Sequence, residues 1–270
     1  SLPTYPFARE RYWVPEMGIQ FGGNIPENPA IVTSIHPLLQ QNTSDFTEQR
    51  FSTIFTGQEF FLSDHQVQGQ RVLPAVAYLE MVRAAAQQAA GGLTEGETVI
   101  RLQNAVWVRP FTVSDQPVRL HIGLFPEENG SIAYEIYSDA EETEAEPVVY
   151  GQGSVVLSQA SEVQSLDLAV LKAQCSQNST TPDEIYKTFK QMGLEYGPGF
   201  RGIEAMYLGA DQVLAKLSLP SSIFNTHDQY VLHPSIMDAA LQSSLGLMAD
   251  IGDLTGSGGK PSLPFALESL

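Results

Sequence analysis

Between residues 51 and 158 the chain alternates short apolar and polar stretches, a pattern that is typical of β-strands. Glycine, proline, asparagine or aspartate bounds several of these stretches, as expected where strands end in turns. The candidate strands are FSTIFTGQEFFL (51–62), TVIRLQNAVWVRPFTV (98–113), PVRLHIGLF (117–125), SIAYEIYS (131–138) and VVYGQGSVVLS (148–158). The pattern therefore predicts a β-rich first half.

One apolar stretch in this region has helical spacing instead. The run PAVAYLEMVRAAAQQAA (74–90) begins with Pro74, whose missing N–H costs nothing in the first turn of a helix. Gly91 and Gly92 follow it and favour a helix end. Alanine is so frequent in the run that the helix can lie deep inside a sheet. We predict a buried helix over these residues.

A second group of elements follows residues 158–180, a Ser- and Gln-rich stretch that predicts a linker around one short helical patch. Thr181-Pro-Asp-Glu184 has the capping residue, the proline and the acidic residues of a helix start. Two strand candidates come next, at 195–209 and 211–219, and then a second helix rich in small residues at 233–249. Strands around a buried helix thus occur twice, although the sequence itself does not repeat.

These patterns divide the chain into four segments. Residues 1–33 combine prolines and aromatic residues without a period, and predict an extended linker arm. The two halves are 34–157 and 181–270, and 158–180 connects them. With 270 residues and 43 % apolar content, the chain is long enough and apolar enough to bury a large core.

Composition argues against several classes of function. The formal charge of −17, with only 14 Lys and Arg residues, disfavours binding to nucleic acids or anionic membranes. No apolar run reaches the roughly 18 residues of a membrane span, and the first residues lack the apolar core of a signal peptide, so we expect a soluble, cytoplasmic protein. Cys175 is the only cysteine, and the five histidines have no metal-ligand spacing, so neither a disulfide nor a metal site is expected.

His65 and Gly69 lie in a polar turn ahead of the first predicted helix. A histidine titrates near neutral pH, and the backbone N–H of a glycine can approach a ligand closely. Proton abstraction beside a carbonyl group requires such a pair, namely a base and a hydrogen bond for the oxygen that becomes negative. A histidine that only hydrogen-bonds the backbone fits the same stretch, and the stretch alone does not decide between the two interpretations.

Asp238 lies inside the apolar second helix, where an unpaired carboxylate is costly to bury. Gln242 follows one turn later on the same face and can hydrogen-bond it. Because Pro234 and Ser235 can start the helix just before Asp238, a role as helix cap is an equal alternative. A functional acid and a helix cap both stay open at this point.

Three spaced motifs in this chain resemble those of the dehydratase domains of modular polyketide synthases. They are HxxxGxxxxP from His65 to Pro74, YGPxF from Tyr196 to Phe200, and DxxxQ from Asp238 to Gln242. The stretches HPLL at 36–39 and LPF at 263–265 also resemble the family, in the same order. The resemblance covers about residues 34–270, and residues 1–33 look like the linker that precedes such domains in a synthase.

The resemblance implies an α+β fold of the double hotdog type, in which each half wraps an antiparallel sheet around a central helix. It places His65 of the first half opposite Asp238 of the second, in a tunnel that admits an acyl chain on a phosphopantetheine arm. The implied reaction is that of a hydro-lyase. Water is lost from a β-hydroxyacyl thioester on an acyl carrier protein, and the α,β-unsaturated thioester remains.

The resemblance also implies roles for single residues. His65 takes the α-proton through Nε2 or Nδ1, and the N–H of Gly69 stabilises the thioester carbonyl, helped by the helix that starts at Pro74. Protonated Asp238 donates to the departing hydroxyl, since desolvation raises the pKa of a carboxyl group. Pro74, Tyr196, Gly197 and Gln242 are further supporting or substrate-binding residues, of which Tyr196 and Gln242 hydrogen-bond near Asp238 and the leaving hydroxyl. No metal is implied, and no cofactor beyond the phosphopantetheine arm of the carrier protein.

Two other activities fit the same scaffold. Relatives that shift double bonds tend to lose the proline or the aspartate, and because Pro74 and Asp238 are both present, dehydration is favoured over isomerisation. Relatives that close an oxygen ring keep both residues, so a dehydratase with an added cyclase activity stays open. An alternative of another class is a non-catalytic domain that binds carrier protein or dimerises.

The expected partners are those of a domain in a large synthase. They are the acyl carrier protein, the neighbouring polyketide synthase domains and a second copy of the chain in a homodimer. Members of the family usually continue past the LPF motif with further strands. We therefore expect the second half, 181–270, to be incomplete at its C-terminal end.

Overall fold

The computed structural model describes residues 34–91, 98–140, 146–159, 165–175, 178–247 and 263–270. The predicted linker arm at 1–33 lies outside these residues. From Thr33 to Leu270 the chain forms one unit. No helix in the described part is long and apolar enough to cross a membrane.

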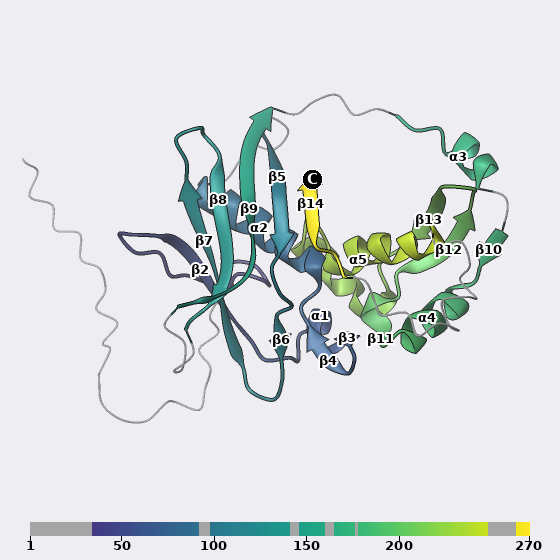
Figure 1. Ribbon diagram of the computed structural model, residues 1–270, viewed down its shortest axis with the longest axis horizontal. Coiled ribbons are helices and arrows are strands. Elements are labelled where there is room, and N and C mark those ends of the chain that lie inside the picture. Colours follow the sequence, from purple (N-terminus) through teal and green to yellow (C-terminus); the bar gives the residue numbers. More distant parts are fainter. Residues whose placement is uncertain (1–33, 92–97, 141–145, 160–164, 176–177, 248–262) are drawn as a thin grey trace, which may run out of the picture. The chain divides into compact units, whose positions relative to one another are not determined.

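A seven-stranded antiparallel sheet forms the larger layer of this unit (Figure 1). Phe51 of β2 and Leu120 of β7 are buried on one face, whereas Ile54 and Arg119 point the other way and are exposed, as the alternation of apolar and polar residues predicts. In spatial order the strands are β1 (Gln41–Asn42), β2 (Gln49–Phe55), β7 (Val118–Pro126), β8 (Ile132–Ser138), β9 (Val148–Gln159), β5 (Thr98–Trp107) and β14 (Ala266–Ser269).

Helix α2 (Ala75–Ala89) packs against β5, β7 and β9 of this sheet. Pro74 is its N-cap residue, and Gly91, with a φ of +73°, follows its end, so the helix predicted over 74–90 is confirmed. Its alanines at 84–86 are at most 3 % exposed. Such short side chains let the helix lie close to the strands, and α2 therefore forms the centre of the first core.

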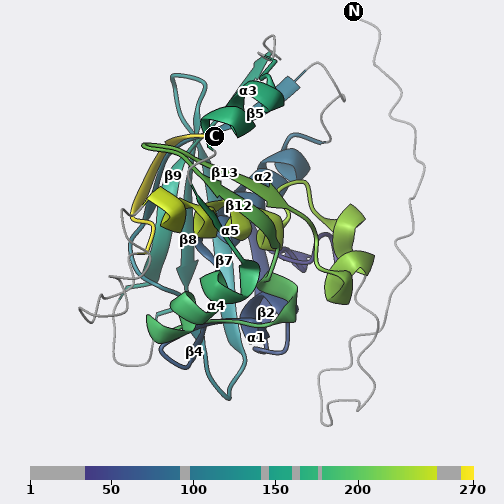
Figure 2. The same cartoon turned by 90° about the vertical axis from the view of Figure 1, so that its right-hand side faces the viewer.

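A three-stranded antiparallel sheet forms the smaller layer, in the order β10 (Asn178–Thr180), β12 (Ile203–Leu208) and β13 (Val213–Leu217). Figure 2 shows α5 (Pro234–Ser243) lying against β12 and β13. Helix α4 (Pro182–Gln191) covers β12, and Ile185 of α4 joins Met206 and Ala239 in a second core. This arrangement gives the second half its own buried helix, as the pattern of elements predicts.

The starts of two further helices follow the sequence signals. The helix start predicted at Thr181 is confirmed for α4, where Thr181 and Glu184 form a capping box. Inside the predicted linker, α3 (Leu168–Gln174) is the expected helical patch, and the side chain of Asp167 caps it. Three 3₁₀ helices also occur in the described part of the second half, at Pro198–Phe200, Ser221–Gln229 and Ser244–Leu247.

A small four-stranded sheet and the last strand join the two halves. Strands β3 (His65–Val67), β4 (Gln70–Val72) and β6 (Thr112–Val113) come from the first half, and β11 (Leu194–Tyr196) from the second pairs with β3. In the same way β14 pairs with β5 of the large sheet. The second segment, 181–270, thus contributes a strand to each of two sheets formed by the first segment, 34–157.

Three predicted strands are wrong in part. The stretch at 98–113 is interrupted after Trp107, the stretch at 195–209 contains the 3₁₀ helix Pro198–Phe200, and the stretch at 51–62 is wrong in its second part. The stretch at 51–62 was expected to be extended throughout, but β2 ends at Phe55 and α1 (Phe60–Ser63) forms a single helical turn. Gly57 turns the chain with a φ of +80°, and the carboxylate of Glu59 accepts hydrogen bonds from the N–H groups of Thr56 and Gly57. These local bonds compete with continued strand pairing.

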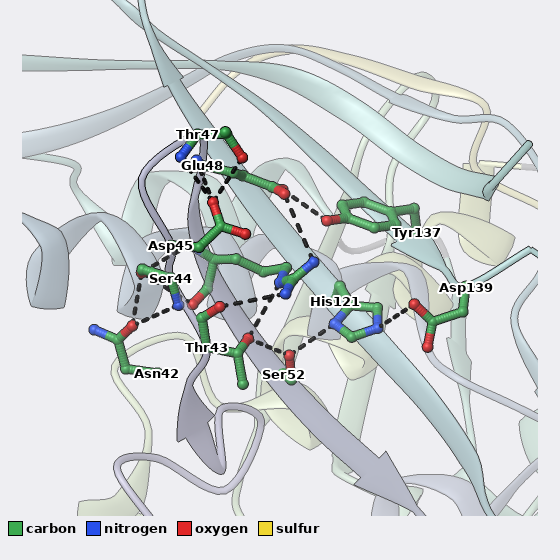
Figure 3. A network of polar contacts seen from close by, with 11 residues as sticks. Asn42, Thr43, Ser44, Asp45, Thr47, Glu48, Ser52, His121, Tyr137 and Asp139 are labelled. Carbon is green, nitrogen blue, oxygen red and sulfur yellow. Dashed lines mark hydrogen bonds and ion pairs between the residues drawn. The ribbon is translucent and has the colours of Figure 1, made fainter.

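A polar network lies on the face of the large sheet that points away from α2 (Figure 3). Ser52 Oγ hydrogen-bonds His121 Nδ1 at 2.7 Å and Thr43 Oγ1 at 2.5 Å, and Tyr137 donates to Glu48 at 2.6 Å. Nε2 of His121 lies 3.2 Å from Asp139 but without the alignment of a hydrogen bond. The hydrogen bonds of this network tie β2, β7 and β8 together.

Candidate active site

A cavity of about 560 Å³ lies where the two halves meet. Its walls are mostly apolar and include Tyr78 and Trp107 of the first half and Phe189 and Leu241 of the second. Of the residues that the sequence singles out, His65, Tyr196, Asp238 and Gln242 line this cavity, whereas Gly69, Pro74 and Gly197 do not. An apolar cavity with a few convergent polar groups is typical of a ligand-binding or active site.

His65 is the first residue of β3 and is 7 % exposed. Its Nδ1 lies 2.8 Å from the carbonyl oxygen of Val72. Because a carbonyl oxygen can only accept, Nδ1 carries the proton of the neutral ring and Nε2 has the free lone pair. The structure thereby distinguishes the two nitrogens that the sequence leaves open, and the basic atom is Nε2.

Asp238 lies in the second turn of α5, past the residue that caps the helix. The cap is His233, whose Nδ1 accepts a hydrogen bond from the N–H of Ser235 at 3.2 Å, so the interpretation of Asp238 as a helix cap is wrong. Gln242 Nε2 donates to Asp238 Oδ2 at 2.7 Å, as their spacing predicts. Burial raises the pKa of the Asp238 carboxyl, and His65 and Gln242 offset this only in part.

His65 Nε2 and Asp238 Oδ1 face each other at 3.9 Å. The side chains are 8 % and 9 % exposed, respectively. The distance is too long for a hydrogen bond, so each group is free to bond a substrate. A basic nitrogen atom and a buried carboxyl group with a raised pKa thus lie close enough to contact two neighbouring carbon atoms of one molecule.

Aromatic rings hold His65 in place. Tyr196 of β11 pairs in register with His65, with their ring centroids 5.6 Å apart, and the ring of Phe200 lies 5.4 Å from the imidazole. Burial raises the pKa of Tyr196, and nearby Asp238 adds to this effect. The Tyr196 hydroxyl therefore stays protonated at neutral pH, and it remains a hydrogen-bond donor at the cavity wall.

Comparisons with known proteins decide the family. Residues 36–139 match the family model for the polyketide synthase dehydratase domain, and residues 164–270 match that for the polyketide synthase dehydratase N-terminal domain. Among solved structures, a dehydratase domain of a trans-AT polyketide synthase from Brevibacillus brevis is 54 % identical, with a TM-score of 0.82 over 87 % of this chain and 80 % of that one. The chain belongs to the polyketide synthase dehydratase domains.

Two other relatives add detail to this membership. Polyketide synthase PksM of Bacillus subtilis (strain 168) is 48 % identical over all of this dehydratase domain, which spans 6 % of PksM. The CurK dehydratase of the curacin polyketide synthase is 26 % identical, with a TM-score of 0.75 over 87 % of this chain and 80 % of that one. CurK has also been solved as inactive mutants with a histidine changed to phenylalanine or an aspartate to asparagine. The α+β double hotdog fold and the hydro-lyase class predicted from the sequence are confirmed.

Gly69 does not lie where the sequence interpretation puts it. It occupies the tight turn between β3 and β4 together with Gln68, with φ values of +77° and +51°. A Cβ atom added at Gly69 would meet nothing within 4 Å. The glycine of the dehydratase motif is therefore required by the left-handed turn, and its N–H is not part of the cavity wall.

Asp64, which the sequence interpretation overlooks, connects the dehydratase motifs of the two halves. Its carbonyl oxygen accepts from the N–H of Gly197 at 2.8 Å, and its Oδ2 accepts from the N–H of Gly199 at 2.7 Å. A Cβ atom at Gly197 would overlap the Asp64 carboxyl group. The two glycines of the YGPGF motif thus leave room for the residue before His65, and they fix Tyr196 and Phe200 beside the imidazole.

Replacing Gly197 with alanine is therefore expected to destabilise the domain. The added methyl group overpacks the contact with Asp64, and we expect the free energy of unfolding to fall by about 1–3 kcal/mol, measured by urea denaturation. Adding Asp64→Gly removes the overlapping side chain, so the double variant should lose less stability than the sum of the two single variants. Strictly additive losses would contradict this account of the motif.

Proposed function

We propose that this domain removes water from a β-hydroxyacyl thioester carried on an acyl carrier protein, leaving the α,β-unsaturated thioester during polyketide chain elongation. The observation that carries the proposal is the facing pair of His65 Nε2 and Asp238 Oδ1 at 3.9 Å in one cavity. One atom is a base with a free lone pair, and the other belongs to a carboxyl group whose pKa is raised by burial and to which we assign the proton.

The proton transfers follow from these two protonation states. Nε2 of His65 takes the proton from the α-carbon, whose C–H bond is acidified by the thioester carbonyl. The electron pair forms the double bond as the C–O bond at the β-carbon breaks, and Asp238 gives its proton to the departing hydroxyl, which leaves as water. His65 is then protonated and Asp238 ionised, and transfer of a proton from His65 to Asp238 restores the pair.

The start of α2 stabilises the negative charge that develops on the thioester oxygen. Ala75 lines the cavity and is the first residue of this helix of 15 residues. The N–H groups of Ala75 and Val76 lie in the first turn, where no intrahelical acceptor exists, and the helix dipole adds a partial positive charge. These backbone groups take over the role that the sequence interpretation gave to Gly69.

Gln242 orients the acid toward the hydroxyl group of the substrate. Its Nε2 donates to Asp238 Oδ2 and also to the carbonyl oxygen of Phe200, at 2.7 and 3.1 Å. Its Oε1 is buried without a hydrogen-bond partner among the described residues. This free acceptor, with the Tyr196 hydroxyl as a donor, suits a substrate that brings a hydroxyl group into the cavity.

The relatives support the same assignment. A histidine and an aspartate are the residue types replaced in the inactive CurK mutants, and this domain places one of each at its cavity. This domain spans only 6 % of PksM, so the related synthase contains much more chain beside it. The partners in our proposal are the acyl carrier protein, neighbouring polyketide synthase domains and a second copy of the chain. The phosphopantetheine arm presents the substrate, and no further cofactor takes part.

The proposal is tested by incubating the domain with a β-hydroxyacyl carrier protein and following the acyl group by mass spectrometry. We expect loss of one water and a product with one new carbon–carbon double bond. A product that has instead closed an oxygen ring would assign an added cyclase activity, and a displaced double bond would assign an isomerase. Binding of the carrier protein with no loss of water would overturn the proposal in favour of a non-catalytic domain.

A further inference from the structure

The carboxylate of Glu80 is fully buried on α2 and takes no part in the reaction above. We infer that Glu80 is a positioning residue, which holds the segment that leads into α5, and with it Asp238, in register with His65. The inference rests on the proposed function, because it concerns the acid–base pair of that reaction. Glu80 is 0 % exposed and does not line the cavity, so it acts only through other residues.

Glu80 accepts hydrogen bonds from both halves of the domain. Its Oε1 accepts from the backbone N–H of Val231 at 3.0 Å, and its Oε2 from the N–H of Leu232 at 2.9 Å. Nε2 of His36 at 3.1 Å, and two nitrogen atoms of Arg83 at 2.7 and 3.0 Å, complete the contacts of the carboxylate. Both oxygen atoms are thus fully used, and each binds one backbone N–H of the second half.

Every one of these donors favours the ionised carboxylate. Nδ1 of His36 accepts from the N–H of Leu38 at 3.1 Å, so neutral His36 carries its proton on Nε2 and donates it to Glu80. Burial opposes the negative charge, but the hydrogen bonds from His36, Arg83 and the two backbone N–H groups outweigh it and lower the pKa of Glu80 to about 2. A charged acceptor bonds an N–H about twice as strongly as a neutral one.

The segment that Glu80 holds leads without interruption to the acid. Leu232 is followed by His233, the N-cap residue of α5, whose side chain accepts from Ser235 and whose carbonyl oxygen accepts from Met237 at 2.9 Å. Asp238 follows Met237 directly. The N-terminal end of α2 lies close to the base, because α2 begins three residues after Val72, whose carbonyl oxygen orients His65. Helix α2 therefore relates the base to the acid, and the Glu80 carboxylate adds hydrogen bonds to the packing of α2 against the second half.

The decisive test is Glu80→Gln, which keeps the shape of the side chain. A glutamine has one acceptor oxygen and one NH₂ group, and because all the partners of Glu80 are donors, the NH₂ group must face at least one backbone N–H. The segment before α5 is pushed away, and we expect kcat for dehydration to fall on the order of 10-fold to 100-fold. KM should stay unchanged, because the cavity walls that bind the acyl chain are intact.

Glu48→Gln is the matched control. Glu48 also carries a hydrogen-bonded carboxylate that joins two elements, since it accepts from Tyr137 and lies beside Arg50, but it belongs to the network on the outer face of the large sheet (Figure 3). We expect Glu48→Gln to keep the kcat of the unchanged domain. Amide hydrogen exchange gives a second measurement, in which the N–H groups of Val231 and Leu232 should exchange faster in Glu80→Gln and not in Glu48→Gln.

The outcomes separate this inference from the proposed function. If the unchanged domain dehydrates its substrate and Glu80→Gln exchanges faster at Val231 and Leu232 while its kcat is unaltered, the positioning role is refuted and the dehydratase stands. If Glu80→Gln does not fold, Glu80→Asp keeps the charge but withdraws it from the N–H groups, and a kcat equal to that of the unchanged domain refutes the inference equally. Absence of dehydration in the unchanged domain would instead overturn the proposed function.

Discussion

Replacing His65 with alanine is expected to lower kcat for dehydration by about 10²–10⁴-fold. The imidazole supplies the only free basic lone pair that we assign to the α-proton, at an Nε2 atom held in place by the bond from Nδ1 to the carbonyl oxygen of Val72. Removal of the ring leaves the apolar walls of the cavity in place. KM should therefore change much less than kcat, as measured by steady-state kinetics with a β-hydroxyacyl carrier protein.

His227→Ala is the control for this variant. His227 is half exposed, pairs with Asp228 on the surface and does not line the cavity, so its loss should leave kcat unaltered. Circular dichroism and a thermal melt are the measurements that check whether both variants remain folded. Dehydration at an undiminished rate by folded His65→Ala would show that another group removes the α-proton.

Replacing Asp238 with asparagine is expected to cost a similar factor, about 10²–10⁴ in kcat, because an amide has no acidic proton for the departing hydroxyl. The side chain of asparagine keeps the shape of the carboxyl group and the partner Gln242. The pH profile of the unchanged domain provides the companion measurement. Burial raises the pKa of Asp238. We therefore expect kcat to stay constant at pH values above the usual pKa range of a carboxyl group, and to fall as the pH rises through the raised pKa.

Asp238→Asn is expected to lower kcat, but to gain stability relative to the unchanged domain as the pH rises. The folded state binds the proton of Asp238 more tightly than the unfolded state, whose pKa is the ordinary 3.8, so stability falls as pH rises from that value to the raised pKa. The amide side chain of the variant does not titrate. The advantage of Asp238→Asn in the free energy of unfolding should therefore grow with pH over this window, by about 1.4 kcal/mol per pH unit, and then stay constant.

Urea denaturation of both proteins at a series of pH values measures this difference. Below pH 3.8 the two stabilities should run parallel, since Asp238 is then protonated in both states. If the variant instead lost stability relative to the unchanged domain as the pH rises, the pKa of Asp238 would be lowered in the folded state, as for an ionised and paired carboxylate. In that case the assignment of Asp238 as the acid would have to be given up.

Asp238 and Glu80 are both buried acidic residues, but the sequence pattern singles out only Asp238. Asp238 attracts attention because it interrupts an apolar helix, and the structure finds it buried in the cavity. Glu80 interrupts the first helix in the same way, between Leu79 and Met81, yet no motif marked it and it was overlooked. Its role depends on the N–H groups of Val231 and Leu232, more than 140 residues away, and no local pattern reveals such partners.

Local signals were most reliable where the physical cause was local. The helix start at Thr181, the start of α2 at Pro74 and the alternation along the large sheet were all predicted, because each depends on neighbours in the sequence. The structure places Gly69 in the turn after β3 and not among the residues that line the cavity. A glycine suits a left-handed turn and a close approach to a ligand equally well, and only the position of the turn relative to the cavity distinguishes them.

Residue order and spacing were enough to identify the family and the two halves with their buried helices, and to single out the residues that we propose as the acid–base pair, because spacing along a chain encodes local structure and motif. Folding in three dimensions settled which nitrogen of His65 is basic, that Asp238 is a buried acid and no helix cap, and that Asp64 and Glu80 hold the halves together. Protonation and orientation depend on which groups fold within hydrogen-bonding distance and on how much water they exclude, and both properties arise only when distant segments meet.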